Sequence, residues 1–248
     1  MRPTGRADGA SWTFVEPRGE QDQLNEPHVP DMRAQDYSEV QDWPGYFGAV
    51  LGKPPRETLV AALDSFARES FTGGLATDLA AGEGRDTLEL LDRGWRVVAT
   101  DGHPDAFSYL WPRVPEAVKP RLTTVVVSFK QTQILPCDLV NASFALPFCE
   151  PRHFPELWTR IVAAIRPGGR FAGQFFGNRD SWASLPDRTH HSENEVIELL
   201  EGFEIEMMRT EERDDEPDVR NPKHWQLFHV VAKKRWRRLR QRPTADRK

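Results

Sequence analysis

The stretch "TDLAAGEGRD" at residues 77–86 decides the fold of this chain. It continues the strand-like run "LATDLA" and opens the helix-like run "GRDTLELLDRG", which ends at Gly94. A strand that passes into a helix through Gly82 and Gly84 is typical of the first unit of an α/β sheet. Glycines at such a turn let a ligand lie against the main chain, and the following helix N-terminus offers free N–H groups.

The alternation of strands and helices continues along the chain. Further strand-like runs lie at 95–101, 121–129, 137–146, 170–177, 203–212 and 224–234. Helix-like runs lie at 53–69, 103–114, 153–169 and 192–202, and in the last of them Ser192 and Glu195 predict a capping box. This order predicts a layered α/β fold whose sheet is parallel except at one edge, where the last two strands form a hairpin.

Composition divides the chain into three parts. Residues 1–35 are rich in Pro, Gly, Asp, Glu and Arg and have no strand or helix period, so we expect a flexible arm. Residues 36–234 form one predicted domain that begins with an aromatic-rich helical flap, and residues 235–248 form a basic tail. The run "KKRWRRLRQR" is typical of a solvated tail, and docking of RNA, an acidic protein or a membrane surface is the alternative.

Composition also limits the classes of partner. The 248 residues carry a formal net charge of -5, which gives no reason to expect affinity for nucleic acid or for anionic membranes. The sequence has neither an apolar run of roughly 20 residues nor an N-terminal apolar segment of the signal-peptide type. We therefore expect a cytoplasmic protein without a membrane partner.

The acids around the glycine turn indicate the kind of ligand. A dinucleotide site requires G-x-G-x-x-G, but Thr87 stands where the third glycine belongs. Asp78 and Glu83 would repel a pyrophosphate, whereas they would attract a ligand that carries an ammonium and a sulfonium. The turn therefore favours S-adenosylmethionine as the cofactor.

A second acid follows the next strand. Asp101 lies at the end of the run "WRVVATD", where a carboxylate accepts hydrogen bonds from both ribose hydroxyls of an adenosine. Enzymes that bind a nicotinamide cofactor share this arrangement. Asp101 therefore distinguishes S-adenosylmethionine from a nicotinamide cofactor only in combination with the acidic turn.

Four motifs resemble those of class I S-adenosylmethionine-dependent methyltransferases, over about residues 36–234. They are "TDLAAGEGRD", "VVATDGHP", "CDLVNASFALPF" and "IRPGGRFAGQFFG", and they occur in the family's order. The resemblance is to the bacterial small-molecule branch, which includes tellurite-resistance-type and thiopurine-type enzymes. It implies a Rossmann-like sheet of seven strands, mostly parallel with an antiparallel last strand, and with helices on both faces.

The resemblance also implies which residues bind the cofactor. Those expected around the methionine moiety are Asp78, Ala80, Ala81, Gly82 and Gly84. Asp101 is expected at the ribose, Gly102, His103, Ser128 and Phe129 at the adenine, and Asn141, Ala142 and Phe144 beside the sulfonium and the acceptor. Two positions depart from the family pattern, since Ala80 replaces its first glycine and Ser128 and Phe129 stand where an acid often meets the adenine amine. The structural alternative is that Asp78 and Asp101 cap the helices that follow them.

Aromatic side chains gather in the flap and at strand ends. Tyr46 is expected to offer an aromatic face to the cofactor, and Arg56 to pair with its carboxylate. The residues expected to bind the acceptor are Trp43, Phe47, Phe148, Phe176 and Trp182. Ordinary core packing is the alternative for each aromatic residue, and solvent exposure is the alternative for Arg56.

The sequence identifies no catalytic residue and predicts no metal site. Methyl transfer needs a base only when the acceptor must lose a proton. His190, His191 and His224 are interpreted as structural or surface residues, and proton transfer to or from the acceptor is the alternative for each. No pair of histidines has zinc-ligand spacing. The segment "NASFALPF" differs from the Asn-Pro-Pro-Tyr type of loop of amino-directed nucleic-acid methyltransferases, which disfavours a base-flipping DNA enzyme.

The predicted function is methyl transfer from S-adenosylmethionine to a small-molecule acceptor. A cofactor-binding regulatory protein without turnover is the first alternative, and a nicotinamide-dependent oxidoreductase is the second.

Overall fold

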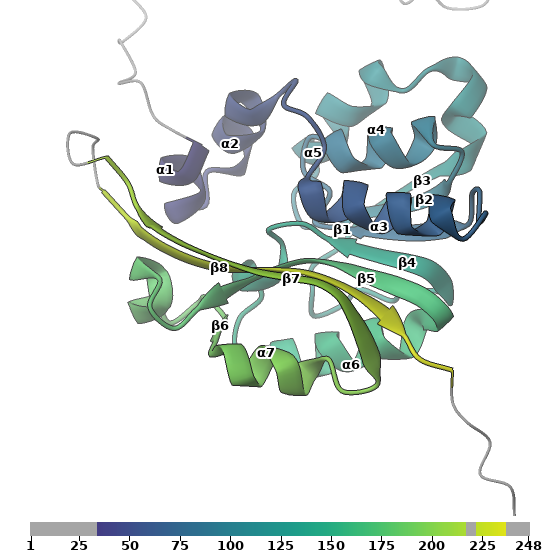
Figure 1. Cartoon of the computed structure of the whole chain (residues 1–248). Helices are drawn as coiled ribbons and strands as arrows, with labels where there is room; N and C mark the ends of the chain where they lie inside the picture. Colours follow the sequence, from purple (N-terminus) through teal and green to yellow (C-terminus); the bar gives the residue numbers. More distant parts are fainter. Residues whose placement is uncertain (1–33, 217–221, 237–248) are drawn as a thin grey trace, which may run out of the picture. The chain divides into compact units, whose positions relative to one another are not determined.

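The computed structural model describes residues 34–216 and 222–236, and a single β-sheet forms its centre (Figure 1). The strands are β1 (Leu75–Leu79), β2 (Arg96–Asp101), β3 (Leu122–Val126), β4 (Cys137–Ala142), β5 (Ile165–Gly177), β6 (His190–His191), β7 (Phe203–Asp214) and β8 (His224–Lys234). Seven of them follow the order β3-β2-β1-β4-β5-β8-β7, and β6 pairs with β5. The prediction of seven strands is wrong by one, because His190 and His191 pair with the end of β5 instead of lying in a loop.

The last strand of the sequence runs against its neighbours. The pairs among β1, β2, β3, β4 and β5 are parallel, whereas β8 is antiparallel to both β5 and β7. A mostly parallel sheet with an antiparallel last strand is therefore confirmed. β8 does not lie at the edge of the sheet, because it is inserted between β5 and β7. This position explains why residues 225–232 are all buried.

Helices cover both faces of the sheet, as the family resemblance implies (Figure 1). The helices α3 (Glu57–Arg68), α4 (Arg85–Asp92) and α5 (Asp105–Leu110) pack on one face, and α6 (Phe154–Ala164) and α7 (Glu193–Leu199) pack on the other. The flap consists of α1 (Ala34–Glu39) and α2 (Trp43–Val50). Short 3-10 helices are η1 (Trp111–Arg113), η2 (Glu116–Arg121), η3 (Leu146–Phe148) and η4 (Ser181–Ser184).

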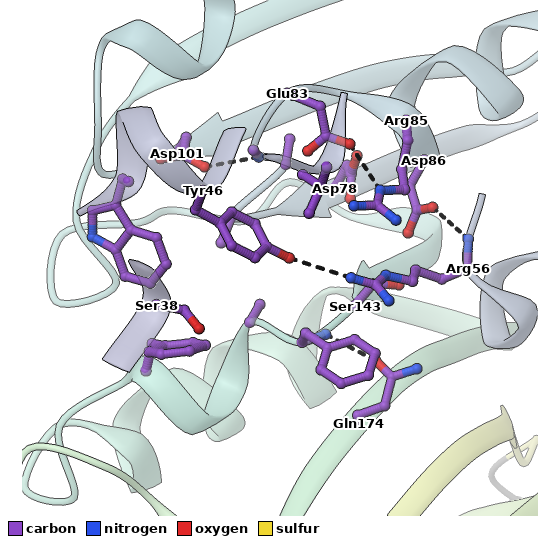
Figure 2. A pocket seen from close by; sticks show the side chains of 18 of the residues that line it. Ser38, Tyr46, Arg56, Asp78, Glu83, Arg85, Asp86, Asp101, Ser143 and Gln174 are labelled. Carbon is purple, nitrogen blue, oxygen red and sulfur yellow. Dashed lines mark hydrogen bonds and ion pairs between the residues drawn. The ribbon is translucent and has the colours of Figure 1, made fainter. Parts of the chain in front are cut away.

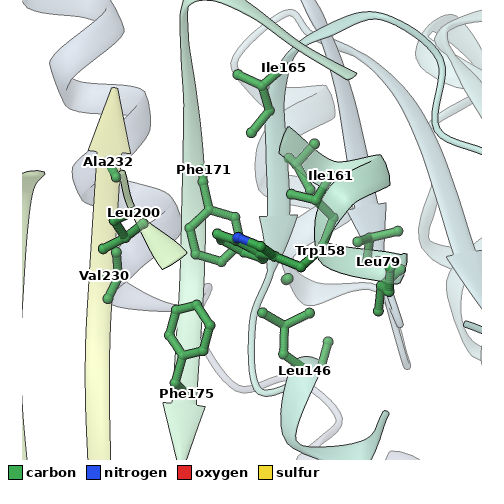
Figure 3. Packing of buried hydrophobic residues seen from close by; sticks show 14 of the residues in the cluster. Leu79, Leu146, Trp158, Ile161, Ile165, Phe171, Phe175, Leu200, Val230 and Ala232 are labelled. Carbon is green, nitrogen blue, oxygen red and sulfur yellow. The ribbon is translucent and has the colours of Figure 1, made fainter. Parts of the chain in front are cut away.

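The core beneath α6 and α7 fixes strands β5 and β8. Trp158 of α6 packs edge-on against Phe171 and Phe175 of β5, with ring centroids 5.1 and 5.6 Å apart (Figure 3). Leu200 and Val230 belong to the same buried cluster. Because each aromatic pair of this kind contributes roughly 0.5–1.5 kcal/mol beyond its buried area, this packing holds the strands that carry one wall of the site.

Helix α6 ends earlier than the sequence indicates. It stops at Ala164, and β5 starts at Ile165, so the Pro-Gly-Gly run at 167–169 lies within the strand. A Cβ at Gly169 would lie 2.6 Å from the backbone oxygen of Asp138. The glycine is therefore needed for the close approach of β5 to β4, and it does not serve as a helix stop.

The two terminal segments of the predicted domain division extend beyond the described residues. Of the arm predicted at 1–35 the structure describes only residues 34 and 35, which belong to α1. Of the basic tail predicted at 235–248 it describes only residues 235 and 236. The three-part division stays a prediction. Among the helices of residues 34–216 and 222–236, none is both long and apolar enough to cross a membrane.

Candidate active site

A cavity of about 900 Å³ lies where the parallel strands end (Figure 2). Its lining combines the flap, the segments that follow β1, β2, β3 and β4, and residues of β7 and β8. The position is the crevice beyond the carboxyl ends of β1 and β4, where the strand order changes direction. We define the turn half by Asp78, Gly82, Asp101, His103 and Ser128, and the aromatic half by Trp43, Phe148, Phe176, Trp182 and Trp225.

Most of the residues selected from the sequence line this cavity. They are Trp43, Tyr46, Phe47, Arg56, Asp78, Ala80, Ala81, Gly82, Asp101, Gly102, His103, Ser128, Phe129, Phe144, Phe148, Phe176 and Trp182. Three others are not part of the lining. Asn141 and Ala142 are fully buried in β4, and Gly84 lies at the start of α4.

The turn after β1 has a left-handed backbone at three positions. Ala80, Gly82 and Gly84 have φ values of +51°, +57° and +89°. Ala80 thus has a left-handed φ although it carries a Cβ, a conformation that favours glycine. A Cβ at Gly82 would only touch the ring of Phe47 at 3.5 Å, whereas a Cβ at Gly84 would lie 2.5 Å from Leu110 Cδ1. Gly82 therefore keeps the backbone bare toward the cavity, and Gly84 permits the packing of α4 on α5.

Asp101 joins the ends of β1 and β2. Its Oδ2 accepts a hydrogen bond of 2.9 Å from the Gly82 N–H, and its Oδ1 accepts one of 2.8 Å from the His103 N–H. Burial raises the pKa of this carboxyl, while the backbone N–H groups of His103 and Gly82 oppose that rise. A carboxylate has about four acceptor positions, so Asp101 keeps acceptor capacity beyond these bonds. It does not cap α5, which has no side-chain cap.

Asp78 belongs to a buried acidic network (Figure 2). Its two oxygens accept hydrogen bonds from Asn141 Nδ2 at 2.8 Å and from Thr87 Oγ1 at 2.6 Å. Asn141 Nδ2 also donates to Asp86 Oδ2 at 2.9 Å, and Asp86 Oδ1 accepts from the backbone N–H of Arg56 at 2.8 Å. Burial, followed by the negative charge of Asp86, raises the pKa of Asp78 to about 7. The network makes the turn half attractive to cations.

Two arginines lie near this network. Arg85 is paired with Glu83 at 2.8 Å, and both side chains are almost fully buried. The guanidinium of Arg56 lies 4.3 Å from the ring centroid of Phe144 and donates to the Tyr46 hydroxyl at 3.3 Å (Figure 2). The structure therefore brings together the three predicted residues Tyr46, Arg56 and Phe144, at the boundary between the two halves of the cavity.

The aromatic half is a continuous set of edge-to-face and tilted rings. The ring of Phe148 lies 5.0 Å from Trp43, 6.3 Å from Phe176 and 6.2 Å from Trp182, measured between centroids. Trp225 of β8 extends the set at 5.7 Å from Trp182. Such rings form a water-excluding wall for a small ligand.

Phe47 lies apart from the other aromatic residues that were expected to bind the acceptor. Its ring is 6.2 Å from that of His103 and 5.9 Å from that of Tyr109. With Gly82 beside it, Phe47 is placed at the turn half.

The three histidines interpreted as structural or surface residues, His190, His191 and His224, lie outside the cavity lining. His191 packs against Phe154 with a centroid distance of 4.6 Å, and burial lowers its pKa to about 4. His190 contacts Phe176 at 5.8 Å. His224, the first residue of β8, is partly exposed, and its ring nitrogens lie 2.8 Å from Asp214 Oδ1 and 3.1 Å from Glu212 Oε1.

Sequence reasoning missed the polar residues that strands β5, β7 and β8 contribute. Gln174 of β5 accepts a hydrogen bond of 2.8 Å from the backbone N–H of Phe144 and donates to Thr58 Oγ1 at 3.0 Å. Glu211 of β7 and His229 of β8 also line the cavity. A histidine inside the apolar run "LFHVVA" was the available signal for His229.

Comparison with known proteins places this fold among methyltransferases. Residues 76–169 match the family model described as a methyltransferase domain. No curated protein matches the sequence significantly.

Several solved structures share the fold at low sequence identity. TehB from Haemophilus influenzae is 16% identical with a TM-score of 0.60, and the match covers 78% of this chain and 67% of TehB. The 1,6-didemethyltoxoflavin-N1-methyltransferase of Burkholderia thailandensis is 20% identical with a TM-score of 0.56, covering 84% of this chain and 92% of that chain. Its crystals contain 1,6-didemethyltoxoflavin and S-adenosylhomocysteine. A TehB-like S-adenosylmethionine-dependent methyltransferase from Corynebacterium glutamicum is 19% identical with a TM-score of 0.51, covering 82% and 99%.

Proposed function

Because the chain carries a class I S-adenosylmethionine-dependent methyltransferase domain, we propose that it methylates a small-molecule acceptor held in the aromatic half of the cavity. The observation that supports this most directly is the sharing of one cavity by the acidic turn half and the aromatic half. The cofactor and the acceptor can therefore lie next to each other within one cavity.

The hydrogen-bond acceptors, the charge and the shape of the turn half all fit S-adenosylmethionine. Asp101 accepts hydrogen bonds from the ribose hydroxyls, with its carboxylate already oriented by the N–H groups of Gly82 and His103. The bare backbone at Gly82 lies along the methionine moiety, and the acidic pair Asp78 and Asp86 favours its ammonium, since Glu83 is paired with Arg85.

The segments after β2 and β3 bind the adenine in this proposal. Gly102 and His103 lie on one side of the base, and Ser128 and Phe129 lie on the other. At the opposite end of the cofactor, Arg56 pairs with the carboxylate of the methionine moiety. Tyr46, which accepts a hydrogen bond from Arg56, helps to close this end.

The aromatic half supports the acceptor assignment. S-adenosylmethionine supplies a methyl group on a positively charged sulfur, so the protein mainly has to align the acceptor and exclude water. Trp43, Phe148, Phe176 and Trp182 perform both tasks with apolar faces and edges. The Burkholderia methyltransferase, which carries a small molecule beside S-adenosylhomocysteine, agrees with a small-molecule acceptor for this chain.

Two measurements on the purified protein test the proposal. Calorimetry with S-adenosylhomocysteine and with NADH identifies the cofactor, and we expect binding of the first alone. Incubation with methyl-labelled S-adenosylmethionine and a panel of phenol, amine, thiol, selenite and tellurite acceptors then measures transfer. Labelled product confirms the enzyme. Tight binding without transfer to any acceptor supports a regulatory protein, and binding of NADH alone supports an oxidoreductase.

A further inference from the structure

A histidine stands in the wall of the cavity with no role in the function described so far. His229 occupies the middle of β8, and its strand partners are Gln174 on β5 and Arg209 on β7. Its ring meets that of Phe144 edge-on, with centroids 6.3 Å apart. Only 4% of the residue is exposed, yet it lines the cavity. Because Phe144 is also at the contact between the two halves, His229 is placed near the point where the acceptor meets the cofactor.

Both ring nitrogens of His229 face carboxylates. Nε2 lies 3.0 Å from Glu211 Oε2, and Nδ1 lies 3.2 Å from Glu57 Oε1. Each carboxylate also has an arginine partner, since Arg209 binds both of them and Arg213 Nε donates to Glu211 Oε1 at 2.9 Å. Arg213 also pairs with Asp215 at 3.2 Å, so the two arginines compensate the charges of Glu57 and Glu211 only in part.

The two nitrogens differ in their hydrogen bonds. In the tautomer that carries its proton on Nε2, the ring donates to Glu211 Oε2 and leaves its lone pair on Nδ1. Nδ1 is buried and makes no hydrogen bond within the described part of the chain. A proton that arrives on Nδ1 meets the Glu57 carboxylate at 3.2 Å, so the imidazolium is stabilised on both sides.

The surroundings of His229 keep it unprotonated before the reaction. Burial lowers its pKa, and the positive charge of Arg209 adds to that effect, while Glu57 on α3 and Glu211 on β7 act in the opposite direction. A neutral imidazole is the form that can accept a proton.

We propose that His229 is a catalytic residue that accepts a proton from an O–H or N–H acceptor, with Glu211 orienting its ring and Glu57 stabilising its cation. This inference rests on the proposed methyl transfer. The acceptor's proton moves to Nδ1, and the electron pair left on the acceptor atom forms the bond to the methyl carbon as the C–S bonding pair returns to sulfur. The proton then leaves His229 for solvent. The substrate class is therefore a phenol, an enol or an N–H heterocycle, rather than a thiolate or an oxyanion that needs no base.

The first test compares acceptors in wild type and in His229→Gln, in which glutamine keeps an N–H for Glu211. With phenol, which ionises near pH 10, we expect the variant to lose about 100- to 10,000-fold in kcat near neutral pH. Its rate should then rise about tenfold per pH unit toward the pKa of phenol, since hydroxide replaces the missing base. With thiophenol, which ionises unaided near neutral pH, the loss should stay below about threefold.

His224→Gln is the matched control. His224 lies on the same strand and also faces two carboxylates, but it is outside the cavity lining. We expect this variant to keep the wild-type rate and pH profile. A His229→Gln enzyme that keeps the wild-type rate and pH profile with phenol overturns the inference and leaves the proposed function intact. Absence of S-adenosylhomocysteine binding in wild type overturns the proposed function itself.

The second test needs no acceptor. Imidazole NMR of the full chain, with His229 assigned by the signals lost in His229→Gln, should show the proton on Nε2 and titration below the ordinary value of 6.5. In Glu211→Gln the pKa of His229 should fall further, because a negative charge is removed. A proton on Nδ1, or titration above pH 7, contradicts the role proposed for His229.

Discussion

Asp101 Oδ2 accepts a hydrogen bond of 2.9 Å from the backbone N–H of Gly82, so the acid that ends β2 also shapes the turn that follows β1. The same carboxylate therefore has two tasks in the proposed site. It orients the bare turn, and it offers its remaining acceptor positions to the ribose. A substitution at Asp101 should affect both the sugar and the methionine end of the cofactor.

Asp101→Ala should raise the Kd for S-adenosylhomocysteine by about 10- to 100-fold, because each charge-assisted hydrogen bond contributes roughly 1.5–3 kcal/mol. Calorimetry measures the affinity, and circular dichroism should show that the fold persists. Asp92→Ala, an exposed acid at the end of α4, serves as the control and should bind normally. Unchanged affinity in Asp101→Ala would mean that the ribose assignment is wrong.

Gly82 and Gly84 should respond differently to alanine. Gly84→Ala combines a left-handed φ with a Cβ placed 2.5 Å from Leu110 Cδ1, so we expect a loss of about 2–4 kcal/mol in unfolding free energy. Gly82→Ala has only the φ cost, about 1–2 kcal/mol, but its methyl group points into the ligand space and should weaken cofactor binding. Urea unfolding and calorimetry check the pair, and equal destabilisation by both would contradict this division of roles.

The pKa of about 7 at Asp78 predicts how stability depends on pH. The folded state holds this proton more tightly than the unfolded chain, whose carboxyl has the model value of 3.8. The contribution to stability is therefore present at low pH and is lost as pH rises through about 7, by at most about 1.4 kcal/mol per pH unit. Urea unfolding of wild type and Asp78→Asn from pH 4 to 8 measures it. Parallel curves for the two proteins would exclude Asp78 as the source.

Substitutions at Phe148 and at Phe129 should have separate effects, the first on acceptor binding and the second on cofactor binding. Phe148→Leu removes the ring that contacts Trp43, Phe176 and Trp182, so KM for the acceptor should rise about tenfold while the affinity for S-adenosylhomocysteine stays within twofold. Phe129→Leu should weaken S-adenosylhomocysteine and leave the acceptor KM nearly unchanged. The reverse pattern would mean that the cofactor binds in the aromatic half and the acceptor in the turn half.

Arg56→Gln tests the anionic end of the cofactor. Loss of the guanidinium should raise the Kd for S-adenosylhomocysteine by about 10- to 100-fold. Binding of 5′-methylthioadenosine, which lacks the amino-acid moiety, should change by less than threefold. If both ligands weaken equally, Arg56 acts on the site through its contacts with Tyr46 and Phe144 and not through the carboxylate.

The parts of this molecule that depend on local sequence were predictable. The capping box is confirmed, with the Ser192 N–H donating to Glu195 Oε2 at 2.6 Å. The β1 turn, flanked by acids, indicated S-adenosylmethionine, and the family model that matches residues 76–169 confirms a methyltransferase domain. These features depend on residues within a few positions of one another, which is why spacing alone identified them.

Other features depend on partners far along the chain. Asn141 belongs to a recognised motif, but its amide is turned toward Asp78 and Asp86 and lies behind the cavity wall. Trp225 and His229 reach the cavity only because β8 is inserted between β5 and β7. Strand order is set by packing across the whole sheet, and no short pattern in the sequence encodes it.

Because β8 is inserted between β5 and β7, the sheet cannot be completed before residues 224–234 have been synthesised. The residues that surround the turn half leave the ribosome well before residue 224 is made, whereas the wall that holds His229 is added last. Until then β5, one of the most buried strands of the sheet, has an unpaired edge. A nascent chain that stalls before β8 therefore leaves the edge of β5 open, and such an edge invites aggregation.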